Sequence, residues 1–324
     1  MMKRRIISIA ALLFLALYPV TFGGSSPYHS AIMIVLGIYV ILAISLDLLV
    51  GFAGQISLGH AAFYAIGAYA SGILTVTYNM SPVGAMLVGL SLSGVIAAFI
   101  GWSVLKLRGY YLAMATMGLA AITHTLIIGM QSLTGGASGL RDVPPFRIFG
   151  ISMDSYVHYY YFVWAMVVLV IVCCLAIIRS PMGRTLMAIH SDEAAASTLG
   201  INCAFQKTST FVASSMFASL AGSLYAHYMG FLAPDDFSIF TSVHILVMVF
   251  LGGVGTIYGA AFGAMFLKLL PELTHTFQDY ELLGNGLILI VVLVFMPKGL
   301  WGVITAVGRK LKLTGDAISE GNSE

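Results

Sequence analysis

Polar side chains gather where glycines interrupt a long apolar stretch, and they could contact a small solute. The sequence GFAGQISLGH covers residues 51–60, between two apolar segments. Backbone opened inside a membrane is tolerated only where it is buried in protein or faces a wet cavity. The amide of Gln55, the hydroxyl of Ser57 and the imidazole of His60 could therefore bond the opened backbone or a polar solute. The candidate pathway residues of this first break are Gly54, Gln55, Ser57, Gly59 and His60.

A second glycine-rich break, LGGVGTIYGAAFGA, covers residues 251–264 in the other half of the chain. Two interrupted apolar segments in separate halves point to a transport pathway. Glycines that recur every four residues also permit close helix packing. The candidate pathway residues here are Gly252, Gly253, Gly255 and Thr256, and the packing glycines are Gly255, Gly259 and Gly263.

Catalytic sets are missing from the sequence. It has no G-x-x-x-x-G-K-[ST] stretch that could cradle a nucleotide phosphate, and no Ser/His/Asp or Cys/His constellation. Cys173 and Cys174 are adjacent in an apolar run and Cys203 stands alone, which predicts neither a disulfide nor a metal site. We expect no enzyme activity, no cofactor and no metal, so the energy source must lie on partner subunits.

The composition places these motifs in a membrane. Of 324 residues, 59% are hydrophobic and 9% are charged, with a net charge of +2. Soluble domains carry about 25% charged residues, so this chain cannot cover a water-exposed surface. That excludes a soluble enzyme, a nucleic-acid binder and a disordered chain. The apolar runs are long and unbroken, which predicts an all-α polytopic membrane protein.

Apolar runs of about 20 residues match the thickness of the hydrocarbon layer. We expect spans near residues 6–23, 30–50, 60–78, 82–105, 110–131, 158–178, 208–230, 241–271 and 282–304. The stretch 241–271 is too long for one helix, so the total is eight to ten transmembrane helices with broken or re-entrant segments. The first stretch resembles a signal peptide, but it lacks a convincing cleavage site and a retained helix is expected. Basic residues accumulate on the cytoplasmic side, and their distribution predicts a cytoplasmic N-terminus.

One inner loop, residues 179–207, carries the densest polar sequence in the chain. Ser180 can cap a helix that begins at Pro181, and Ser191 or Asp192 can cap a second, alanine-rich helix. Glu193 would complement the dipole of that helix and Gly200 would end it. A plain connecting loop has little use for a rigid hairpin, whereas helix-in-groove docking requires one. The candidate docking residues are Arg184, Asp192, Glu193, Ala194, Ala195 and Gly200.

Few ionisable residues fall inside the expected spans. Asp47 lies near the inner end of its span, where it could snorkel or cap the break at Gly51. His124 and His244 are single histidines and are expected to be hydrogen-bonded packing residues. In the outer loop 230–240, Asp235 and Asp236 are expected to form a solvated face, or to receive a basic patch of a partner.

Several segments resemble one family. Glu193-Ala194-Ala195 followed by Gly200-Ile201 resembles the EAA loop of ABC importer permeases, and the surrounding GRTLMAIHSDEAAASTLGIN resembles that loop in branched-chain amino-acid permeases of the LivM type. Five further segments, from about residue 30 to residue 305, resemble the same family: GQISLGHAAFYAIGAY, LRGYYLAMATMGLA, TGGASGL, GGVGTIYGAAFGA and MPKGLWG. Asp47 stands where such permeases commonly have Asn, and Ala260 where they commonly have Pro.

The resemblance implies a membrane permease subunit of an ATP-driven ABC importer for branched-chain amino acids, in a bacterial inner membrane. Its partners would be a second, homologous permease, two cytoplasmic ATPases docked on the loop 179–207, and an extracytoplasmic amino-acid binding protein. Residues 1–312 would form a single transmembrane permease domain, and residues 313–324 a disordered tail.

Two alternatives remain open at this stage. A permease for urea or short amides would use the same architecture, because nothing in the sequence reads the solute side chain. An ion-coupled secondary transporter or channel would work without ATP. It would be expected to hold paired acidic or basic residues at mid-membrane, where only Asp47 is a clear acid.

Overall fold

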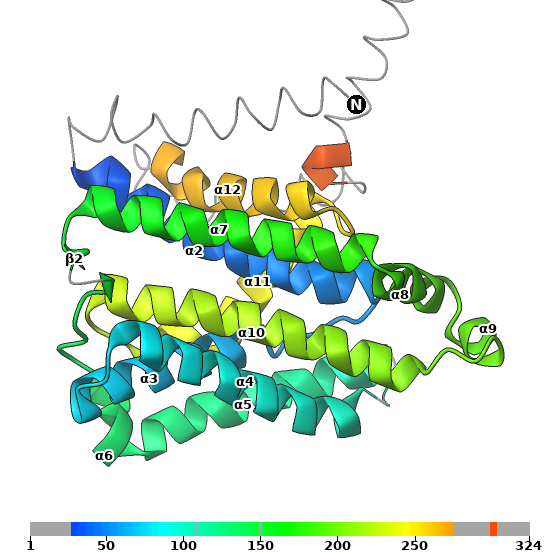
Figure 1. Ribbon diagram of the computed structural model, residues 1–324, viewed down its shortest axis with the longest axis horizontal. Coiled ribbons are helices and arrows are strands. Elements are labelled where there is room, and N and C mark those ends of the chain that lie inside the picture. Colours follow the sequence, from blue (N-terminus) through cyan, green and yellow to red (C-terminus); the bar gives the residue numbers. More distant parts are fainter. Residues whose placement is uncertain (1–26, 106, 108, 149–150, 275–298, 303–324) are drawn as a thin grey trace, which may run out of the picture.

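The structure, a computed structural model, describes residues 27–105, 107, 109–148, 151–274 and 299–302. Long helices run along the long axis of the molecule (Figure 1). The helices are α2 (Pro27–Asp47), the π-helical turn η1 (Leu48–Phe52), α3 (His60–Tyr78), α4 (Pro82–Val104), α5 (Tyr110–Gly129), α6 (Gln131–Thr134), η2 (Gly136–Ser138), α7 (Tyr156–Arg179), α8 (Pro181–Ser191), α9 (Glu193–Thr198), α10 (Cys203–Met229), η3 (Pro234–Phe237), α11 (Ile239–Gly252) and α12 (Ile257–Thr274). A small antiparallel hairpin joins β1 (Arg147–Ile148) to β2 (Ile151–Ser152).

The apolar runs of the sequence fold as helices at the expected places. Within the described residues, five helices are long and apolar enough to cross a membrane: α2 with η1, α3, α4, α5 and α7. Counting the bent pair α11 and α12 as one span makes six. The expected span 6–23 lies outside the described residues, as does 282–304 apart from residues 299–302. A multi-pass helical membrane protein is therefore supported, while the total of eight to ten spans stays a prediction.

The expected span 208–230 forms α10, but this helix is not among the five apolar ones. It packs against α2, α3 and α4 in the middle of the bundle. Its buried hydroxyls bond neighbouring backbone: Ser214 Oγ donates to the Ser45 carbonyl oxygen (2.5 Å) and Ser223 Oγ to that of Gly67 (3.1 Å). Because other helices cover it, α10 can carry polar side chains that lipid would not tolerate.

Helices α3 and α10 approach each other closely through small residues. A Cβ atom at Gly67 would overlap the backbone of Ser219, and one at Gly222 would overlap the carbonyl of Tyr64. Farther along, Ser71 Oγ lies 2.7 Å from His227 Nε2. The contacts Phe63–Phe211, Gly67–Ser223 and Ser71–His227 rise together in residue number, so the two helices run in the same direction.

The expected interruption within 241–271 is confirmed. Helices α11 and α12 meet at an angle of 118° across a short break. Gly253 and Gly255 have φ angles of +113° and +78°, a region that favours glycine. The Thr256 hydroxyl donates to the Gly253 carbonyl oxygen (2.8 Å) and stabilises the turn.

Candidate functional site

The loop 179–207 folds as the predicted helical hairpin, α8 followed by α9, at one end of the bundle (Figure 1). We call it the α8–α9 hairpin. Asp192 Oδ1 accepts hydrogen bonds from the backbone N–H groups of Ala194 (2.8 Å) and Ala195 (3.0 Å), so Asp192 is the cap of α9. Ser180 occupies the N-cap position of α8 without the side-chain bond that we expected.

An ion pair anchors the hairpin to the bundle. Glu193 Oε1 lies 2.8 Å from Lys207 Nζ on α10, and these side chains are 25% and 7% exposed. The sequence suggested that Glu193 acts on the dipole of α9, but not that it ties α9 to α10. Beyond α9, Gly200 has a φ angle of +80°, which reverses the chain toward α10.

The exposed side chains of the hairpin include small and apolar ones. Ala194 and Ala195 are exposed, and so is Arg184 on α8. Leu199 is 80% exposed and Phe205, at the start of α10, is 59% exposed. A rigid helix with exposed small and apolar side chains fits a groove of a partner protein.

The first break lies directly beside this hairpin. Gly54 has a φ angle of +66°, and a Cβ atom placed on it would lie 3.1 Å from Nδ1 of His190 on α8. The backbone N–H of Gln55 donates to the Leu49 carbonyl oxygen (3.1 Å) and closes η1. The Gln55 side chain is 3% exposed, and its two polar atoms have no hydrogen-bond partner among the described residues.

Other polar residues of the first break have local partners. His60 Nε2 lies 2.7 Å from Ser45 Oγ on α2. Ser57 Oγ accepts from the backbone N–H of Gly59 (3.3 Å). Ser57 and His60 are both buried. These bonds hold the loop between α2 and α3 in shape, and a pathway role for Ser57, Gly59 and His60 stays a prediction.

The two breaks, far apart in sequence, meet at Asp47. Its Oδ1 accepts from the backbone N–H of Gly255 (2.8 Å), and the side chain is fully buried. Gly51 lies so close to Gly255 that a Cβ atom would have no room. Asp47 therefore caps the second break instead of snorkelling or capping the break at Gly51. No short-range pattern joins residues in two distant segments, so nothing in the sequence signals this contact.

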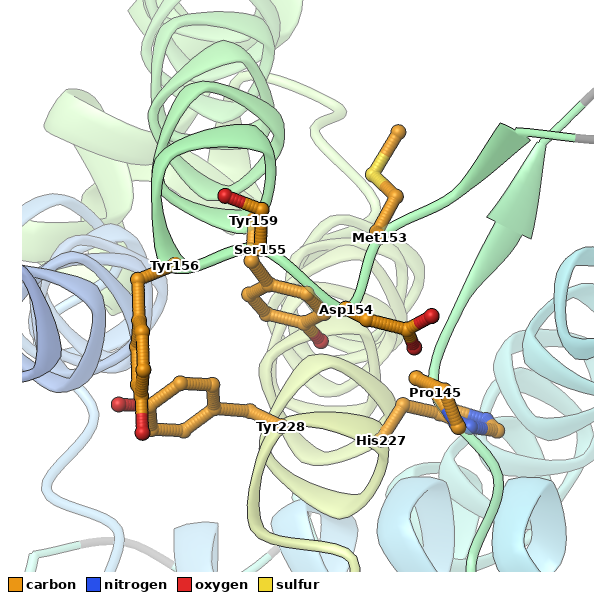
Figure 2. Close-up of a pocket in the computed structure, with 8 residues that line it drawn as sticks. All are labelled: Pro145, Met153, Asp154, Ser155, Tyr156, Tyr159, His227 and Tyr228. Carbon is orange, nitrogen blue, oxygen red and sulfur yellow. The ribbon is translucent and has the colours of Figure 1, made fainter.

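A separate cavity of about 210 Å³ opens at the end of the bundle opposite the α8–α9 hairpin. Figure 2 shows the Asp154 carboxylate on the side of His227 and Pro145, with the rings of Tyr156 and Tyr228 beyond Tyr159. None of the pathway residues predicted from the sequence lines this cavity. It belongs to the space between the ends of α7 and α10.

Residues 28–296 match the family described as branched-chain amino acid transport system, permease component. The chain belongs to this permease family. It is 31% identical over 290 residues to the high-affinity branched-chain amino acid transport system permease protein LivM of Salmonella typhimurium, covering 81% of this chain and 67% of that protein. The LivM protein of Escherichia coli is equally similar. LivH of Escherichia coli is 28% identical over 281 residues, covering 82% and 91% of the two chains. No solved structure matches.

The hydrogen bond between Asp47 and Gly255 can be tested by its effect on uptake. Asp47→Leu removes the acceptor and leaves the partly buried N–H of Gly255 unpaired, which costs about 1–3 kcal/mol. A change of 1.4 kcal/mol alters an equilibrium constant tenfold, so we expect uptake to fall about tenfold. Asp47→Asn keeps an oxygen acceptor in place, so we expect it to retain most of the uptake. The measurement is radiolabelled leucine uptake at matched membrane abundance, and equal uptake by both variants would contradict the capping role.

Proposed function

We propose that this chain is a permease subunit of an ATP-driven importer for branched-chain amino acids, in a bacterial inner membrane with its N-terminus in the cytoplasm. It would pair with a second, homologous permease, dock two cytoplasmic ABC ATPases and receive amino acids from an extracytoplasmic binding protein. Family membership supports the transport role, and the relatives named LivM and LivH support the substrate class.

The observation that carries the proposal is the α8–α9 hairpin. It is the direct continuation of α7 and leads directly into α10. Movement of a docked ATPase would therefore act on two long helices at once. The contact between His190 and Gly54 would pass the movement to the first break, and Asp47 would pass it to the second. Because interfaces are bistable rather than continuously deformable, a small shift at the hairpin can change access to the pathway.

Docking can be tested by crosslinking. The cysteines Cys173, Cys174 and Cys203 are unpaired, so a cysteine-free background can be made with serine. In that background we expect Leu199→Cys to crosslink to an ATPase subunit in membranes of the assembled transporter. Tyr78→Cys is the control, since Tyr78 is 67% exposed at the opposite end of the bundle. A failure of Leu199→Cys to capture any ATPase would exclude docking at the hairpin.

Substrate and energy source need a second experiment. In proteoliposomes holding the assembled transporter and its binding protein, we expect leucine uptake to require ATP on the hairpin side. Urea in excess should not compete. Competition by urea would favour the amide permease, and uptake driven by an ion gradient without ATP would favour a secondary transporter.

A further inference from the structure

The segment after α10 turns back into the bundle instead of staying at its end. The Tyr69 hydroxyl donates to the Leu232 carbonyl oxygen (3.3 Å), and the ring of Phe237 lies 5.5 Å from that of Tyr69. Tyr69 is the middle residue of α3. The short helix η3, with Asp236 beside Phe237, therefore lies near half depth of the spanning helices.

Asp236 lies among tyrosines at this depth. Its Oδ2 accepts a hydrogen bond from the Tyr225 hydroxyl (2.9 Å). The ring of Tyr64 lies 5.6 Å from that of Tyr225, and the Tyr64 hydroxyl is within electrostatic range of Asp236. Tyr64 is 1% exposed, and its hydroxyl has no hydrogen-bond partner among the described residues. A buried hydroxyl without a partner is costly, so a missing partner is expected here.

A lysine lies on the other side of the same region. Lys268 Nζ of α12 lies 3.7 Å from the centroid of the Tyr39 ring, a cation–π contact. Tyr39 is one residue from the midpoint of the 25-residue span Tyr28–Phe52, so the ammonium is also near half depth. Asp236 and His244 are within electrostatic range of Lys268.

The bundle encloses these acidic and basic groups only in part. Asp236, Lys268 and Tyr39 are half-buried, and His244 on α11 is exposed. Charged groups at this depth avoid lipid and mark bundle interiors or water-filled paths. Among the described residues, no ion pair within 4.0 Å joins Asp236 to Lys268. The two opposite charges therefore act on each other electrostatically without forming an ion pair.

We propose that Asp236 and Lys268 bind the two charges of an α-amino acid at mid-membrane, Asp236 its ammonium group and Lys268 its carboxylate. This inference rests on the proposed function and names the substrate site within it. Tyr64 would give the bound molecule a buried hydroxyl partner. A neutral molecule such as urea would pair with neither charge, so the site would select for zwitterions.

Protection of a cysteine tests occupancy directly. In the cysteine-free background, His244→Cys is exposed to a cationic methanethiosulfonate reagent in membranes of the assembled transporter without ATP. We expect labelling that leucine slows several-fold, while urea and leucinamide, which lacks the carboxylate, do not slow it. Adding Lys268→Met should remove the protection by leucine. Absence of labelling, absence of protection by leucine, or protection that survives Lys268→Met would each overturn the inference.

Uptake provides a second readout. We expect Asp236→Asn and Lys268→Met each to lower leucine uptake at least about 30-fold. Each substitution leaves one charge of the bound amino acid without its partner in the protein. Asp235→Asn is the matched control, since that side chain is 97% exposed and an exposed charge contributes little. Lys268→Arg keeps the charge and should retain more uptake than Lys268→Met. Uptake unchanged in Asp236→Asn and Lys268→Met would overturn the site while leaving ATP-driven import and hairpin docking intact.

Discussion

Replacing Gly222 by leucine is expected to prevent the bundle from assembling. A Cβ atom at this position would overlap the carbonyl of Tyr64 on α3, and backbone cannot move aside as the end of a flexible side chain can. Forcing α3 and α10 apart also disturbs the bond between Ser71 and His227. Overpacking of this kind costs about 3 kcal/mol or more, a large part of the stability of a typical domain. We expect little monodisperse protein after detergent extraction, measured by fluorescence-detected size-exclusion chromatography.

A matched pair of alanine variants separates this packing effect from helix propensity. Gly222 and Gly118 both lie inside long helices, but a Cβ atom at Gly118 would meet nothing within 4 Å. Gly118→Ala is expected to leave abundance and melting temperature unchanged or slightly higher, since alanine favours helix by about 0.5–1 kcal/mol. Gly222→Ala should lower both. Equal behaviour of the two variants would show that α3 and α10 are not in close contact.

Reversing the charge of Glu193 is expected to abolish uptake while leaving the chain in the membrane. Glu193→Lys places a second ammonium against Lys207, whose side chain is 7% exposed and cannot turn to solvent. Breaking a pair that is mostly buried costs about 3 kcal/mol, or roughly a hundredfold in the population of the anchored hairpin. Since the pair lies at the end of the bundle, the core packing of α3 and α10 is untouched. The measurements are leucine uptake and membrane abundance of the same preparation.

The reciprocal exchange distinguishes anchoring from direct contact with the ATPase. The double variant Glu193→Lys with Lys207→Glu restores an ion pair of opposite polarity. If Glu193 acts by holding α9 on α10, the double variant should recover a large share of the uptake lost in Glu193→Lys. Uptake that stays absent in a stably inserted double variant would assign Glu193 a contact with the partner instead.

Local structure could be predicted where one segment carries its own signal. The apolar run that follows the first glycine-rich break predicts a span at residues 60–78, and α3 has the same bounds. Ser191 or Asp192, followed by Glu193 and three alanines, predicts a capped helix, and the structure has Asp192 as the cap with two accepted hydrogen bonds. Each of these two signals is contained in one short segment of the chain, so no knowledge of the rest of the fold is needed.

Contacts between distant segments could not be predicted in this way. The hydrogen bond from Gly255 to Asp47 depends on how α2 and the second break pack together. The residues around Asp47 carry no pattern that predicts a contact with Gly255, and those around Gly255 carry none that predicts Asp47. Asp236 was expected to form a solvated face or to receive a basic patch of a partner, because it lies beside Asp235 in an expected outer loop. The structure instead turns that loop toward Tyr69, where Asp236 is half-buried. Acidic and basic groups at mid-membrane were expected only for an ion-coupled transporter, and the substrate site that we propose for Asp236 and Lys268 gives them a different role.

The polar character of α10 bears on how the chain enters the bilayer during synthesis. A helix rich in buried serine and threonine gains little free energy by partitioning from the translocon into lipid alone. Its hydroxyls find acceptors on α2 and α3, which are made earlier on the ribosome. Insertion of α10 is thus expected to wait until those segments are in place, which makes biogenesis of this half of the protein dependent on the half that precedes it.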